Sequence, residues 1–110
     1  MKHFSYKQVS LTGGFLASKE ELNRKNTIGA VYDRFYETGR IEAFTFTRND
    51  VHYFWDSDVA KWMEGVAYVI AKDPDPVLEA RVEEMIDDII AHQWEDGYIN
   101  SYYTTIEPEN

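Results

Sequence analysis

Two amphipathic segments separated by a short proline-rich turn constrain the fold of this chain more than any other feature. Apolar residues recur at helical spacing on both sides of the sequence KDPDP. Asp73 precedes a proline and is therefore biased away from the helical conformation, whereas Asp75 and Pro76 suit the N-cap and first position of a new helix. The pattern predicts helices at 57–72 and 76–94, packed as an antiparallel hairpin because so few residues join them.

A third helix is predicted at 19–38. Ser18 and Glu21 have the spacing of a capping box, in which each side chain accepts a hydrogen bond from a backbone amide of the first turn. Gly39 suits the position after the helix, where a left-handed conformation is common. The poor helix formers within 26–29 weaken the middle of the segment. Its apolar residues at helical spacing are Leu22, Ile28, Val31, Tyr32 and Phe35.

The remaining segments are predicted to be short or irregular. Residues 5–14 alternate loosely and end at a Gly-Gly pair, which indicates a short strand. Residues 40–53 form a connector, either a strand or a loop, and residues 95–110 form a turn and tail. The sequence therefore predicts a single partial, mainly α domain over 1–110: an α-hairpin plus a further helix, with an N-terminal strand. Some apolar surface is expected to stay uncovered unless another chain or segment covers it.

Charge and residue usage exclude several functional classes. With 20 acidic and 11 basic residues the net charge is −9, and such a surface repels phosphate backbones, so nucleic acid is not an expected partner. The absence of cysteine excludes disulfides, Cys-ligated zinc and a cysteine nucleophile supplied by this chain. His3, His52 and His92 show no metal-binding spacing. No apolar run is long enough for a signal peptide or a membrane span, so no membrane partner is expected and the predicted location is cytoplasmic.

The stretch FWDSD at the start of the 57–72 helix is the first candidate site. Asp56, Ser57 and Asp58 are residue types that cap a helix and favour its positive end, and a helix start is the first interpretation. The alternative is a sugar site, in which Phe54 or Trp55 stacks on the ring and Asp56 accepts hydrogen bonds from hydroxyl groups. The pattern of a calcium-binding loop is not present.

The stretch QWEDGY at the end of the predicted 76–94 helix is the second candidate site. It places an amide, carboxylates, an indole and a phenol near one sharp turn, and this mixture suits sugar recognition by Gln93, Asp96 and Tyr98. An ordinary turn at a helix end, with Gly97 as the stop residue and the rings in the core, is an equal alternative on residue type alone.

Five segments, in order, resemble one known family. They are LTGGF, ETGRIEAF, FWDSDVAKWMEG, DPDPVLEARVEEMID and QWEDGYINSYYTTIEPE. Together they resemble the N-terminal part of glycoside hydrolase family 127, the β-L-arabinofuranosidase group, over nearly the whole chain. The most specific parts are FWDSDVAKW and DGYINSYY. Leu16 and the pair Trp94-Glu95 depart from the usual family residues, and neither position is assigned to catalysis.

The resemblance implies a larger enzyme. Members of the family look like an (α/α)6 barrel followed by β-sandwich domains. They remove β-L-arabinofuranose with retention, using a cysteine nucleophile held near zinc and a glutamate. These groups lie in later parts of the family chain, so no catalytic residue and no metal ligand is assigned to this chain. The resemblance also suggests that the 5–14 strand joins a later sandwich.

Two functions are consistent with these observations. The first is an N-terminal fragment or truncated relative of a retaining β-L-arabinofuranosidase, inactive alone, whose partners are an L-arabinose-containing glycan and either a second copy or a missing C-terminal region. The second is a stand-alone helical carbohydrate-binding or protein-interaction module that oligomerises. The predicted substrate-binding residues are Phe54, Trp55, Asp56, Asp58, Gln93, Asp96 and Tyr98.

Overall fold

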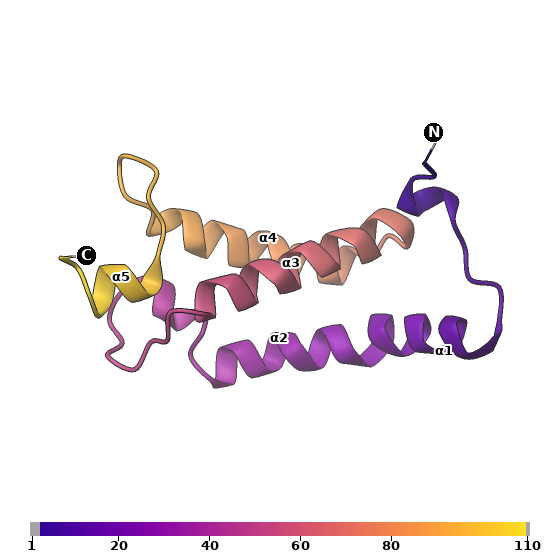
Figure 1. Cartoon of the computed structure of the whole chain (residues 1–110), viewed down its shortest axis with the longest axis horizontal. Coiled ribbons are helices and arrows are strands. Elements are labelled where there is room, and N and C mark those ends of the chain that lie inside the picture. The colour runs from indigo at the N-terminus through magenta and orange to yellow at the C-terminus, as the bar shows by residue number, and fades with distance from the viewer. Residues whose placement is uncertain (1–2, 110) are drawn as a thin grey trace.

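The computed structural model describes residues 3–109, and its regular structure is helical (Figure 1). Its helices are α1 Gly14–Leu22, α2 Ile28–Glu37, α3 Trp55–Lys72, α4 Pro76–Ala91 and α5 Ser101–Thr105. Shorter helical segments are η1 Tyr6–Gln8, η2 Asn23–Thr27 and η3 Glu42–Thr45. The mainly α prediction is confirmed. No helix within the described residues is long and apolar enough to cross a membrane.

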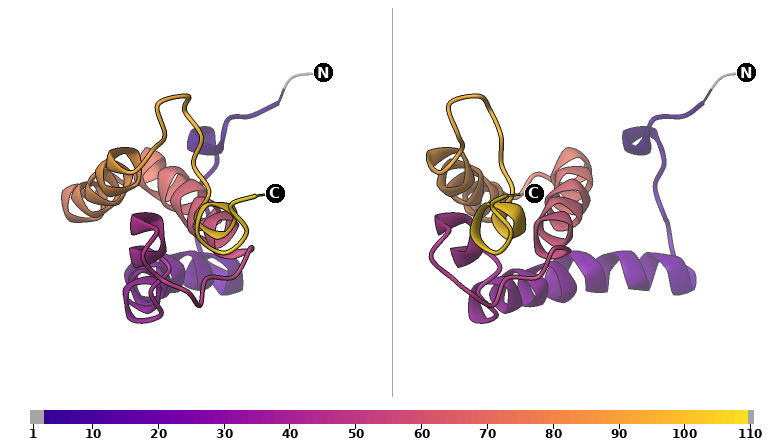
Figure 2. Two further views of the ribbon diagram at one scale, coloured as in Figure 1. Left: turned by 90° about the vertical axis from the view of Figure 1, so that its left-hand side faces the viewer. Right: turned by 60° about the vertical axis from the view of Figure 1, so that its left-hand side comes forward.

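Helices α3 and α4 form the predicted antiparallel hairpin, and they run side by side in Figures 1 and 2. Helix α3 ends at Lys72 because Asp73, before a proline, has extended backbone angles. The Asp75 side chain caps α4 by accepting a hydrogen bond from the Leu78 amide at 3.1 Å, and Pro76 occupies the first turn. Helix α4 ends at Ala91, three residues before the predicted end.

The third predicted helix is longer than expected. Helices α1 and α2 are joined through the π-helical segment η2, so the chain stays helical from Gly14 to Glu37 (Figure 1). Ser18 therefore lies inside the helix and its hydroxyl donates to the Phe15 carbonyl at 2.8 Å, so the predicted capping box is wrong. Leu16 and Ala17 are good helix formers and allow the earlier start. The weak middle segment widens the helix into a π turn without ending it.

The end of α2 follows the prediction at Gly39. This residue has φ of 82°, a region that glycine adopts at low cost. Its amide donates to the Tyr36 carbonyl at 3.2 Å, and the Arg40 amide donates to the Phe35 carbonyl at 3.0 Å. These two hydrogen bonds make a Schellman motif, which satisfies carbonyl groups at the helix end. A Cβ at this position would also collide with the guanidinium of Arg48.

The core lies where α2 meets the α3–α4 hairpin, and the end view in Figure 2 shows the three helices around a common interior. The Trp62 indole N–H donates to the Ile28 carbonyl at 3.1 Å, and this buried hydrogen bond links α3 to the start of α2. Phe35 and Trp62 also meet edge to face, with ring centroids 6.2 Å apart. The buried members of the core are Ile28, Phe35, Ile41, Phe44, Val59, Trp62, Val66, Val69, Leu78, Met85 and Ile89.

The predicted strand at 5–14 is not formed, and residues 3–109 contain no strand. Ser5 caps the 3-10 turn η1, and the Tyr6 ring lies edge-on against Tyr68 of α3 with centroids 5.4 Å apart. Val9 and Leu11 follow with exposed side chains. A single strand leaves its backbone groups unpaired, and the described residues offer no second strand to pair with it.

Candidate functional site

Asp56, in the first turn of α3, is bound to a segment 45 residues later in the chain. One carboxylate oxygen accepts a hydrogen bond from the Ser101 amide at 2.7 Å, and the other accepts one from the Ser101 hydroxyl. Ser101 is the first residue of α5 and is fully buried. Asn100 completes this helix start, since its side chain accepts a hydrogen bond from the Tyr103 amide at 2.8 Å. Asp56 therefore fixes α5 against α3.

The stretch FWDSD does lie at a helix start, as the first interpretation states, but none of its side chains caps the helix. Helix α3 begins at Trp55, and its N-cap residue is Phe54, which makes no side-chain cap. The Ser57 hydroxyl donates backward to the Phe54 carbonyl at 2.9 Å. The turn before the helix is held by His52, whose Nδ1 accepts a hydrogen bond from the Phe54 amide at 3.2 Å.

An exposed group of rings lies beside this turn, and we call it the aromatic patch: His52, Tyr53, Phe54, Tyr102 and Tyr103. Tyr53 stacks on His52 with centroids 4.3 Å apart and lies 4.2 Å from Phe54. It meets Tyr102 of α5 edge-on at 5.7 Å, and Tyr102 meets Tyr103 at 5.2 Å. Tyr53 and Phe54 are more than half exposed. The link between Asp56 and Ser101 thus brings two distant aromatic runs together.

Trp55 and Asp58 contact arginine side chains. The guanidinium groups of Arg40 and Arg48 lie over the Trp55 ring, 5.1 and 5.9 Å from its centroid. Arg40 Nε also lies 3.4 Å from Asp58 Oδ2. Arg48 binds both oxygens of Asp50, at 2.8 and 2.5 Å, and this hydrogen bonding lowers the pKa of Asp50.

The predicted site residues near the end of α4 stabilise their own loop. The side-chain amide of Gln93 donates to the Gly97 carbonyl at 2.6 Å, and the Asp96 carboxylate accepts a hydrogen bond from the backbone amide of Tyr98 at 3.0 Å. Gly97, with φ of 92°, allows its amide to donate back to the Trp94 carbonyl at 2.8 Å. The Trp94 and Tyr98 rings meet at 5.2 Å. These contacts agree with the turn of the ordinary-turn interpretation but not with its core rings, because Trp94 and Tyr98 are 48% and 41% exposed.

The two predicted groups do not share either of two depressions in the described part of the chain. Asp56 lines a depression of about 210 Å³ together with Met63, Ile89 and Ile99. Another depression, of about 280 Å³, is lined by residues that include Phe44 and His92. Among the seven predicted substrate-binding residues, only Asp56 lines either of these two depressions.

The comparisons with known proteins establish the family. The profile of the β-L-arabinofuranosidase, GH127 catalytic domain, matches residues 8–110. The chain belongs to this family. It is similar to a non-reducing end β-L-arabinofuranosidase of Bifidobacterium longum subsp. longum, with 46% identity over 50 residues. The aligned part covers 46% of this chain and 8% of that relative, so the chain aligns with less than a tenth of the relative's length. No solved structure matches it significantly.

The zinc that the family resemblance implies does not fit the described residues. Zinc in proteins is bound by Cys, His and carboxylate side chains, three or four of which converge on the ion. No group of three or more such side chains that could hold a metal is found within 3–109. We therefore assign no zinc ligand among the described residues.

Sequence reasoning missed four members of the aromatic patch, His52, Tyr53, Tyr102 and Tyr103. The runs HYFW and SYY are visible in the sequence, but nothing in either run indicates that it meets the other. Arg40 and Arg48 were missed as well, because a single arginine in an irregular connector carries no pattern. The contact that links the two runs is the pair Asp56 and Ser101, whose hydrogen bonds join α3 to α5 in the structure and leave no pattern in the sequence.

Proposed function

We propose that the chain forms the first helices of a β-L-arabinofuranosidase-type catalytic domain and helps to bind the L-arabinofuranose-containing substrate of that domain. The observation that carries this proposal is the match of the family profile to residues 8–110. The α3–α4 hairpin and the long helix α1–α2 are the kind of units from which an (α/α)6 barrel is built, and we propose that they open such a barrel.

In this proposal the chain supplies substrate contacts and not the nucleophile. The family resemblance implies a cysteine nucleophile, and this chain has no cysteine. Both oxygens of Asp56 are used by Ser101, so this residue acts by positioning α5 and its rings. Phe54, with 56% of its surface exposed, is the predicted residue best placed to stack on a sugar. We propose that the isolated chain has no hydrolytic activity.

A chimeric enzyme tests the proposal. Residues 8–110 replace the homologous segment of the Bifidobacterium enzyme, and hydrolysis of an aryl β-L-arabinofuranoside is measured beside the parent enzyme. We expect a chimera whose kcat/KM lies within about tenfold of the parent, and no turnover by the isolated chain. A folded chimera without activity would contradict the proposed role. Turnover by the isolated chain would contradict the proposal that the nucleophile lies elsewhere.

A further inference from the structure

We propose that the aromatic patch is a carbohydrate-stacking surface that binds a sugar residue of an L-arabinose-containing glycan. The identity of the sugar rests on the proposed function. The evidence for the surface itself is the arrangement of rings from two segments that are distant in the sequence. Among these rings, only Phe54 is a predicted site residue.

Four rings of the patch, those of His52, Tyr53, Phe54 and Tyr103, are exposed, and Tyr102 is half-buried. The exposed fractions are 52% for Tyr53, 56% for Phe54 and 42% for Tyr103. Exposed apolar patches of this kind mark binding surfaces. Tyrosine suits a sugar ligand because its ring offers an apolar face while its hydroxyl can donate and accept hydrogen bonds.

The patch is held in place before any ligand binds. Tyr53 has three ring neighbours, His52, Phe54 and Tyr102, with centroids 4.2 to 5.7 Å away. The Tyr102 hydroxyl donates to a Glu107 carboxylate oxygen at 2.7 Å, which fixes the ring of Tyr102. Rings that are already ordered lose little conformational freedom on binding, so a weak stacking contact yields more affinity.

The position of the patch is set by polar contacts beneath it. Asp56 ties Ser101 to the first turn of α3, and Asn100 caps the helix that carries Tyr102 and Tyr103. His52 accepts a hydrogen bond through Nδ1, so its Nε2 carries the proton and can donate to a sugar hydroxyl. An apolar ring surface with a few well-placed hydrogen-bonding groups is typical of small-molecule binding sites, and it suits a sugar.

The other rings of the two predicted site segments are less suitable for stacking. Trp55 lies under the guanidinium groups of Arg40 and Arg48. Trp94 and Tyr98 are paired with each other on a separate loop. The patch is therefore the ring surface at this end of the molecule that the geometry favours for a ligand.

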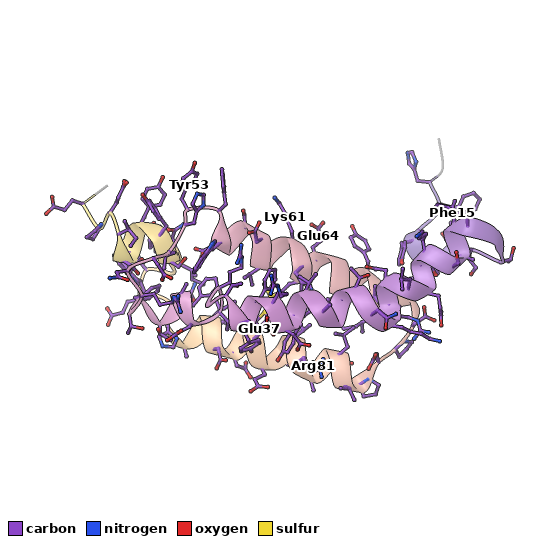
Figure 3. All side chains as sticks on the ribbon, turned by 90° about the horizontal axis from the view of Figure 1, so that it is seen from below. Phe15, Glu37, Tyr53, Lys61, Glu64 and Arg81 are labelled. Carbon is purple, nitrogen blue, oxygen red and sulfur yellow. The ribbon has the colours of Figure 1, made fainter. Side chains whose placement is uncertain are left out.

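An NMR titration of the 110-residue chain tests the inference. The probes are methyl β-L-arabinofuranoside and an L-arabinofuranosyl disaccharide, and amide shifts report the site. We expect shifts centred on residues 52–54 and 101–103. Tyr53→Ala should weaken binding at least about tenfold, because the central ring is lost, whereas Tyr53→Phe should keep most of the affinity. Phe15→Ala is the matched control, because Phe15 is an exposed ring at the opposite end of the molecule (Figure 3), and it should leave binding unchanged.

Three results would overturn the inference: no binding of either sugar, shifts centred outside the patch, or equal affinity of a folded Tyr53→Ala variant. Patch signals that change with protein concentration alone would identify a protein contact surface and also overturn it. The chimera keeps the two proposals separate. An active chimera with an unresponsive patch removes only this inference, whereas an inactive chimera with a sugar-binding patch removes only the proposed function.

Discussion

At the scale of single residues, two aspartates with nearly identical sequence surroundings have different roles. Asp56 holds a fully buried serine with both carboxylate oxygens. Asp58 faces Arg40 at 3.4 Å with 39% of its side chain exposed, so water screens the pair. A helix start can use either residue, and the sequence alone does not show which carboxylate meets a buried partner.

Asp56→Ala is expected to lower the free energy of unfolding by about 2 kcal/mol, because it leaves the Ser101 amide and hydroxyl buried without an acceptor. Asp58→Ala is the matched control and should cost about 1 kcal/mol or less. Urea unfolding followed by circular dichroism measures both. Equal losses for the two variants would show that the contact between Asp56 and Ser101 contributes no more than an exposed ion pair.

The ion pair between Arg48 and Asp50 gives a prediction about pH. Hydrogen bonding from Arg48 lowers the pKa of Asp50 below its ordinary value of 3.8. Since folding lowers this pKa, the contribution of Asp50 to stability is present above 3.8 and is lost as the pH falls through the folded value. We expect an NMR titration of the Asp50 carboxyl carbon to give a value below 3.8, and Arg48→Gln to raise it. An unchanged titration in the variant would exclude Arg48 as the cause.

At the scale of elements, the sequence predicts best what local chemistry decides. The turn between α3 and α4 follows from Asp73, Asp75 and Pro76 alone, and Gly39 ends α2 as expected. The predicted helix start at residue 19 and the predicted strand at 5–14 are both wrong. Several serines can cap a helix equally well on residue type, and a strand depends on a partner that no local pattern supplies.

The candidate site was harder to predict than the helices for the same reason. Its two predicted halves were chosen from residue types at two helix ends, and the loop of Gln93 and Asp96 uses those side chains for its own backbone. The contact between Tyr53 and Tyr102 joins positions 49 residues apart in the sequence, and such long-range contacts are set by packing that a linear pattern does not contain.

The cap of α4 offers a test at this scale. Asp75→Ala removes the acceptor of the Leu78 amide and should lower the free energy of unfolding by about 1 kcal/mol. Asp73→Ala, two residues earlier and before the helix, should change it by about 0.5 kcal/mol or less. Thermal and urea unfolding measure both variants. A larger loss for Asp73→Ala would mean that the turn is held by a contact other than the cap.

At the scale of the whole molecule, the chain is more extended than a compact domain of its size. Its accessible surface is 7829 Å², whereas a compact monomer of 12.9 kDa exposes about 6,300 Å². The radius of gyration is 16.7 Å, against about 13 Å for a compact chain of this length. The excess surface is larger than the about 800 Å² that one partner buries in a standard interface.

Much of this surface lies on α1, which extends beyond the hairpin in Figures 1 and 2 and has no buried residue. Phe15 and Leu16 are 73% and 63% exposed. We therefore expect the isolated chain to self-associate through α1, with species larger than 12.9 kDa in sedimentation equilibrium at micromolar concentration and an unfolding temperature that rises with concentration.

The double variant Phe15→Ser with Leu16→Ser should shift the chain toward monomer, because the apolar contacts of these side chains are lost. Val77→Ser, at an exposed apolar residue of α4, is the control and should not shift the chain toward monomer. A monomer at every concentration, with a constant unfolding temperature, would show that the uncovered surface is tolerated in water.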